Sequence, residues 1–133
     1  MVPTRPRTRR MITIEFPMPC KPLTMNQRMH WAQKAKATKA WREASYIAAW
    51  KFDGSWRPPQ LPRSIVQLDI PVRSTKVRRD PHNWYPTVKA VIDGLVDAGL
   101  WPDDNSDYVA TTEPKFHQGG ATVYVTITPI EPS

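Results

Sequence analysis

Cysteine is nearly absent from this chain, and long apolar runs are absent altogether. The one cysteine, Cys20, has no partner for an internal disulfide and no neighbouring ligand pattern for zinc. We therefore interpret it as a small apolar side chain and expect a reducing compartment. No segment approaches the roughly 20 consecutive apolar residues that cross a bilayer. No run of signal-peptide type follows the basic first ten residues. The expected setting is the cytoplasm, with no membrane partner.

Acidic residues are also scarce, and their distribution is uneven. Nineteen Lys and Arg against twelve Asp and Glu give a formal net charge of +7. Such an excess favours a polyanionic partner, of which nucleic acid is the commonest. Half of the acidic residues nevertheless lie in one segment, 78–107; they are Asp80, Asp93, Asp97, Asp103, Asp104 and Asp107. Two interpretations are open for this segment: a solvated helix face, or a metal site on a nucleic-acid-binding surface.

The length of 133 residues fits one domain. Residues 1–10 alternate Pro and Arg without apolar periodicity, so we expect a disordered basic extension that either contacts phosphates or is inert. The domain itself is expected over 11–130. Alternation of apolar residues predicts strands over 11–16, 64–72, 108–116 and 121–130, with a hairpin turn at 117–120 that leaves His117 exposed. Composition and periodicity predict helices over 31–52 and 88–99. The order βαβαββ indicates an α/β domain with a mixed β-sheet packed against helices.

The second helix carries the pattern that matters most. Its apolar residues recur at helical spacing; they are Val88, Val91, Ile92, Leu95 and Val96. Pro86 suits the first turn, and Gly99 suits the position just after the end, with Leu100 packing back on Leu95. Lys89, Asp93 and Asp97 share the opposite face, which predicts a weak Lys–Asp pair and a solvated Asp97.

Two further groups of aspartates flank this helix. Asp80 leaves the second strand, and Asp103 and Asp104 follow the helix. A helix of about 12 residues spans roughly 18 Å, so Asp80 and Asp104 meet only if the loops fold back. Convergence would suit phosphodiester cleavage, which needs a hard cation held by carboxylates and a lysine such as Lys89 to offset developing charge. Turn formation by "PDDN" is the equally open alternative.

Three motifs carry a resemblance to a known family. They read "RRDPHN", "TVKAVIDGL" and "LWPDDN", and the run "KAxxDGLxxAGxxxDD" from Lys89 to Asp104 is the most specific part. The proline-rich "FPMPCKPLTMNQRMHW" adds Asn26 and Arg28. In these residues the chain resembles the RusA-type Holliday junction resolvases, small endonucleases frequent in phages and prophages. For a phage-encoded member the expected setting is the cytoplasm of the bacterial host.

The resemblance implies a RusA-like fold and a Mg²⁺-dependent, or Mn²⁺-dependent, endonuclease that resolves branched DNA as a homodimer. Asp80, Lys89 and Asp104 would be the catalytic residues. The metal ligands would come from Asp80, His82, Asp103 and Asp104. Asp93 and Asn83 would support them from outside. The DNA would be contacted by basic and polar residues, namely Asn26, Arg28, Lys34, Lys36, Arg78 and Arg79.

One departure from the family pattern leaves alternatives open. His82 stands where the family has its second acidic residue, and imidazole is a poorer Mg²⁺ ligand than carboxylate. It would act as a ligand, as a general base, or only as part of the loop. A branched-DNA-binding module that has lost cleavage is therefore the alternative function, and a purely structural protein is a third. Trp84 and Trp101 would either stack on bases or pack in the core, and core packing is favoured for Trp101.

Overall fold

The computed structural model describes residues 10–130, so the predicted extension 1–10 lies outside the described residues except for Arg10. Eight elements follow along the chain. They are β1 (Ile12–Pro17), α1 (Trp31–Lys51), β2 (Ser64–Val72), η1 (Pro81–Trp84), α2 (Tyr85–Asp97), β3 (Val109–Thr111), β4 (Lys115–Gln118) and β5 (Thr122–Pro129). Among residues 10–130, none of the helices combines the length and apolarity needed to cross a membrane.

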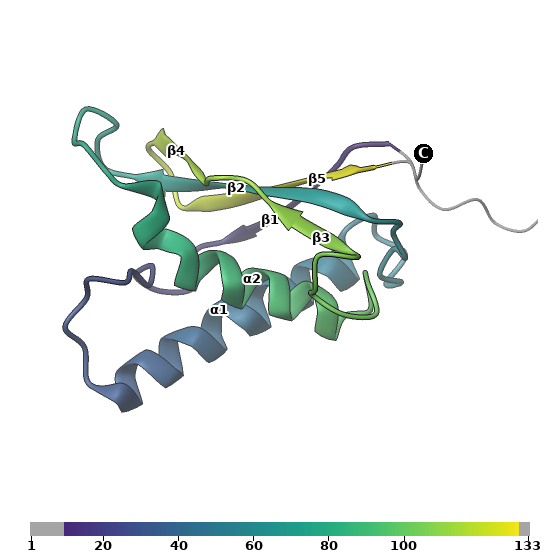
Figure 1. Cartoon of the computed structure of the whole chain (residues 1–133), viewed down its shortest axis with the longest axis horizontal. Coiled ribbons are helices and arrows are strands. Elements are labelled where there is room, and N and C mark those ends of the chain that lie inside the picture. The colour runs from purple at the N-terminus through teal and green to yellow at the C-terminus, as the bar shows by residue number, and fades with distance from the viewer. Residues whose placement is uncertain (1–9, 131–133) are drawn as a thin grey trace, which may run out of the picture.

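The strands form one mixed sheet in the order β1-β5-β2, with β3 and β4 both on the far edge of β2 (Figure 1). β5 runs antiparallel to both of its neighbours, and β3 and β4 run parallel to β2. The chain is therefore a small α/β domain with a mixed sheet, as its pattern predicts. The parallel β2–α2–β3 unit is possible because α2 carries the chain back along the sheet.

Both helices cover the same face of the sheet (Figure 1). Alternate residues of the three longest strands point toward them and are buried; they are Ile12, Ile14, Phe16, Val66, Leu68, Ile70, Val123, Val125 and Ile127. Trp41 of α1 is fully buried and meets Phe16 edge to face, with ring centroids 6.0 Å apart. The apolar stripe of α2 completes the core, because Val88, Val91 and Leu95 are at most 2% exposed.

The two ends of α2 are set by local chemistry. The helix runs over Tyr85–Asp97, three residues earlier at its start than periodicity predicts, because Pro86 fits its first turn. Ala98 is its C-cap, and Gly99 follows with a φ of +93°, which a glycine adopts without strain. The Gly99 N–H donates to the Val96 carbonyl and the Leu100 N–H to the Leu95 carbonyl, at 2.9 and 3.2 Å. The predicted cap is confirmed.

The predicted hairpin at 117–120 is wrong. Instead of one strand over 108–116 there are two short strands, β3 and β4, and the gap between them includes Pro114, which has no N–H to donate. β4 pairs with β2, and β2 separates it from β5. Gly119 and Gly120, both with positive φ, carry the chain past the end of β2, where the Gly119 N–H donates to the Val72 carbonyl at 3.2 Å. His117 is part of β4 and is only partly exposed.

Candidate functional site

Lys89 is the centre of a polar cluster on the outer face of α2. Its Nζ donates to Asp93 Oδ1 at 2.9 Å, one helical turn further on, and also to Asp104 Oδ2. Asp104 belongs to the loop after the helix, so this loop folds back far enough to reach Lys89. The predicted Lys89–Asp93 pair is confirmed. We call Lys89, Asp93 and Asp104 the Lys89 cluster.

Asp103 has a different task from its neighbour Asp104. Its Oδ1 accepts from the Asp104 N–H at 2.7 Å, and its Oδ2 accepts from the Asn105 side-chain amide at 3.1 Å. Asn105 in turn accepts from the Asp107 N–H at 2.9 Å. The "PDDN" sequence therefore does form the turn that Asp and Asn favour. This turn is also what aims the Asp104 carboxylate at Lys89.

Electrostatics fix the charge state of the Lys89 cluster. The hydrogen bonds from Lys89 to Asp104 and Asp93 raise the pKa of the Lys89 ammonium above its ordinary value. The bond from Lys89, with a smaller one from the Asp103 side, lowers the pKa of Asp104. By formal charge, the cluster combines one ammonium with two carboxylates. It is a negative spot on a chain of net charge +7.

Asp80 shares no hydrogen bond with the Lys89 cluster. It is the N-cap of η1: its Oδ1 accepts from the His82 N–H at 3.1 Å, and its carbonyl accepts from the Asn83 N–H at 3.1 Å. No group of three or more His, Cys, Asp or Glu side chains that could hold a metal ion occurs in residues 10–130. A shared metal site of Asp80, His82, Asp103 and Asp104 therefore stays a prediction.

The proline-rich loop 18–30 is attached to the start of α2. Thr87, which is fully buried, donates to the Leu23 carbonyl at 2.7 Å and accepts from the Leu23 N–H at 2.8 Å. The Met25 N–H donates to the Asn83 carbonyl at 2.7 Å. Asn83 therefore acts through its backbone here. Sequence reasoning missed Thr87, although a hydroxyl one turn before Val91 on the apolar stripe signals a buried polar partner.

The residues predicted to contact DNA divide into two kinds. Most are exposed on the surface: Asn26, Arg28, Lys34, Lys36 and Arg78. Arg79 is partly buried, and its Nη1 donates to the carbonyls of Ser74 and Val77 at 2.7 and 3.0 Å. Its guanidinium also lies 5.7 Å from the Phe116 ring centre. Arg79 thus braces the β2–η1 loop that presents Arg78.

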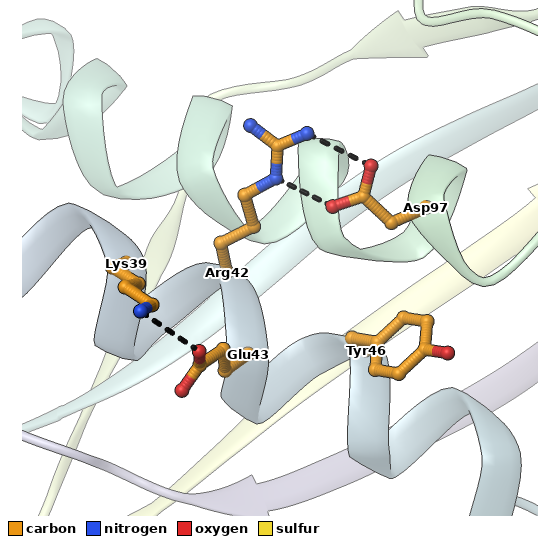
Figure 2. A pocket seen from close by; sticks show the side chains of 5 residues that line it. All are labelled: Lys39, Arg42, Glu43, Tyr46 and Asp97. Atoms are coloured by element: carbon orange, nitrogen blue, oxygen red, sulfur yellow. Dashed lines mark hydrogen bonds and ion pairs between the residues drawn. The ribbon is translucent and has the colours of Figure 1, made fainter.

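Asp97 is exposed, as predicted, but it is also paired with a residue of the other helix. Arg42 of α1 donates two hydrogen bonds to Asp97, from Nε to Oδ2 at 2.5 Å and from Nη2 to Oδ1 at 2.8 Å (Figure 2). The pair lowers the pKa of Asp97 and raises that of Arg42. It lies in a pocket of about 370 Å³ that Lys39, Glu43 and Tyr46 also line. The carboxylates there match the cations, so this pocket has no net charge to attract phosphate.

The two tryptophans that flank the site are held by the protein. Trp101 is 1% exposed, and its Nε1 donates to the Pro62 carbonyl at 3.1 Å, so its core assignment is confirmed. Trp84 is partly buried and packs on Phe116, with ring centroids 4.9 Å apart. Base stacking by Trp84 stays a prediction.

The geometry thus gathers a lysine and two carboxylates on one helix face and leaves Asp80 and His82 at the start of η1. The loop with Asn26 and Arg28 is attached to the same helix start. No protein-family model matches this chain, and a search of curated proteins finds no match either.

Proposed function

We propose that this chain is a divalent-cation-dependent endonuclease of RusA type that cleaves branched DNA as a homodimer. The observation that carries the proposal is the contact of Lys89 with Asp104, fifteen residues away in the chain and beyond a helix end. These are the first residue, Lys89, and the last residue, Asp104, of the "KAxxDGLxxAGxxxDD" motif. Motif residues that meet on the surface of a basic chain favour a site over a solvated stripe.

The donor set around Lys89 suits a hard cation. Mg²⁺ keeps several waters and needs only one or two protein carboxylates. Asp93 and Asp104 already converge on one cationic group, the Lys89 ammonium, so the position favours positive charge. Asp104 and Asp93 would hold the ion, with Asp103 adjacent in the loop. The ion would polarise a phosphoryl oxygen and lower the pKa of a bound water.

Lys89 would act as a charge on the phosphate and not as a base. An ordinary lysine pKa lies well above neutral, so the side chain is a cation at pH 7, and its hydrogen bonds with Asp104 and Asp93 raise that pKa further. A protonated lysine can donate to a phosphoryl oxygen as negative charge develops there. The exposed residues Arg28 and Arg78 would hold the flanking phosphates, and Arg79 would fix the loop on which Arg78 lies. A homodimer would place one such site at each of the two symmetric strands of a junction.

The proposal is tested by cleavage of defined DNA substrates. Purified protein is incubated with a four-way junction, a flap and a linear duplex, with Mg²⁺, with Mn²⁺ and with EDTA. We expect metal-dependent cleavage of the branched substrates. Asp104→Asn should lower the rate by about 100-fold or more, the usual effect of removing one preorganised charged or hydrogen-bonding group. The matched control is Asp107→Asn, an exposed carboxylate in the same loop, which should cut like the parent.

Three outcomes separate the alternatives. Equal cleavage by the parent and Asp104→Asn would overturn the assigned site. Tight junction binding without turnover under either metal would identify a branched-DNA-binding module, the alternative that His82 suggests. Absence of any preference for branched over linear DNA would overturn both.

A further inference from the structure

A cavity of about 190 Å³ opens between the η1–α2 segment and the connection from β3 to β4. We call it the Tyr85 pocket. Its apolar walls and its polar rim include Pro81, Tyr85, Pro114, His82, Thr111 and Glu113. It therefore combines flat apolar surfaces with hydrogen-bonding groups, which is the usual make-up of a ligand site.

The Tyr85 pocket adjoins the Lys89 cluster along α2. Tyr85 lies four residues before Lys89, so both side chains leave the same face of α2. Pro81 and His82 follow Asp80 directly in η1. A ligand group in the pocket would thus lie beside whatever the Lys89 cluster holds.

The size of the pocket limits what can enter. Its volume equals that of about six water molecules at their share of liquid water. Pockets for drug-sized ligands are larger, roughly 300–1,000 Å³. One planar ring system fits this space, whereas a sugar and phosphate would remain outside. Tyr85 is 52% exposed and so offers a ring face for stacking.

The polar groups at the rim have no protein partners. Among residues 10–130, neither the Glu113 carboxylate nor the His82 ring takes part in a hydrogen bond or an ion pair. Thr111 adds an exposed hydroxyl at the same rim. A nucleobase presents donors and acceptors along its edge, and groups of this kind read such edges.

Two larger cavities lack this combination. In the pocket of about 370 Å³ between the helices, the charged groups are already paired with one another. The groove of about 340 Å³ between the end of β1 and α1 is mainly apolar, lined by Phe16, Met18 and Ile47. The first begins one helical turn beyond Asp93, but its paired charges leave no free charged group for a ligand, and the residues that line the second do not belong to α2.

We propose that the Tyr85 pocket accepts one unstacked nucleobase of branched DNA, next to the phosphate that Lys89 contacts. The proposal rests on the proposed function, because it takes branched DNA as the substrate. Unstacking costs least where bases are already unpaired or poorly stacked, as at a branch point. Stacking on Tyr85 and contacts at the rim would offset that cost. The pocket would then fix which phosphate lies at Lys89.

The test uses a series of four-way junctions, each with one abasic site at a different position around the branch point. Binding is measured for each junction. At one position, loss of the base should weaken binding by the parent by about 5- to 150-fold, the range for one stacked base. Tyr85→Ala should bind the intact junction more weakly by a similar factor and should no longer distinguish that abasic junction. Glu113→Ala, at an exposed rim position, should reduce the same difference. Tyr46→Ala is the control, since Tyr46 is exposed on α1 away from the pocket.

The outcomes separate this proposal from the proposed function. If the parent prefers the junction but binds every abasic version equally, the Tyr85 pocket is not a base site and the nuclease proposal stands. If Tyr85→Ala or Glu113→Ala, shown to be folded by circular dichroism, keeps the full discrimination, the pocket assignment is overturned. If the parent does not prefer a junction over linear duplex, the proposed function fails and the pocket proposal fails with it.

Discussion

The aspartates of segment 78–107 differ in the partners that hold them. Asp93 and Asp104 share the Lys89 ammonium, and Asp97 binds the Arg42 guanidinium. Asp80 and Asp103 accept backbone N–H groups in turns. A carboxylate bonded to a turn amide is fixed in place, whereas one that shares an ammonium can exchange it for another cation. This difference is the reason for proposing Asp93 and Asp104 as the residues that would hold a cation.

The first prediction concerns the acid strength of Asp104. In Lys89→Gln the ammonium is lost, so the pKa of Asp104 should rise toward its ordinary value. In the parent, the lowered pKa stabilises the fold above the ordinary carboxyl pKa of the unfolded chain. This contribution disappears as the pH falls through the lowered folded value. The free energy of unfolding should therefore differ between parent and variant by at most about 1 kcal/mol at neutral pH, since the groups are exposed.

Carboxyl NMR titration measures the Asp104 pKa directly. Lys39→Gln is the control, because Lys39 pairs with Glu43 on α1 and should leave Asp104 unchanged. An Asp104 pKa that is the same in the parent and in Lys89→Gln would show that the two side chains do not interact in solution.

Sequence predicts a residue's partner only when the partner is local or belongs to a motif. The Lys89–Asp93 pair follows from a spacing of four on a helix. Spacing leaves open whether Asp80 and Asp104 meet, and the motif implies only that Lys89 and Asp104 belong to one site. Their direct contact is a finding of the structure. The sequence does not predict that Asp97 pairs with Arg42, because the two residues lie 55 positions apart on different helices. No periodicity on α2 can reveal which face of α1 lies beside it.

At the scale of elements, the contact between α1 and α2 depends on a glycine. Gly94 lies where the two helices approach most closely: a Cβ there would collide with Ser45 Oγ and the Arg42 carbonyl. Ser45 uses the same approach to donate to the Val91 carbonyl at 2.8 Å. Gly94 is therefore explained by packing. The close approach of the helices also brings Arg42 of α1 within hydrogen-bonding distance of Asp97 of α2.

The second prediction compares two glycine replacements. Gly94→Ala should lower the free energy of unfolding by about 3 kcal/mol or more, because backbone and a buried hydroxyl must move apart. Gly99→Ala meets no neighbouring atom and is strained only by its positive φ, so about 1 kcal/mol is expected. Urea denaturation of both variants measures the difference. Equal losses would mean that the helices separate easily and that Gly94 is not a close contact.

The elements themselves follow from the sequence, but their pairing does not. Strand alternation and helical spacing predict both helices and all three long strands to within a few residues. The hairpin prediction was wrong because it used only a local signal, a Gly-Gly turn between two strand patterns. The pairing of β4 with β2 is a contact between residues far apart in the chain, and no local pattern reveals it. The pairing depends on the β2–α2–β3 crossover, which places the strands after α2 on the edge of β2 that faces away from β5.

At the scale of the whole molecule, the exposed cations have a common location. The start of α1, the loop 18–30 and the β2–η1 loop lie at one end of the molecule (Figure 1). These segments carry Arg28, Lys34, Lys36 and Arg78, all exposed. η1 and the start of α2, the helix that carries Lys89, lie at the same end. A polyanion would be attracted to this end first.

The third prediction follows from that charge distribution. Binding of DNA by phosphate contacts releases counterions, so the logarithm of the affinity falls with the logarithm of the salt concentration by about 0.9 per duplex phosphate. Replacing Lys34 and Lys36 together by Gln should reduce this slope by about 2 and weaken binding to every sequence alike. Lys51→Gln is the control: Lys51 lies at the other end of α1, about 25 Å away, and interacts with the Trp56 ring. Fluorescence anisotropy from about 50 to 200 mM salt measures the slopes. An unchanged slope in the double variant, or an equal change in the control, would show that DNA does not bind at this end of α1.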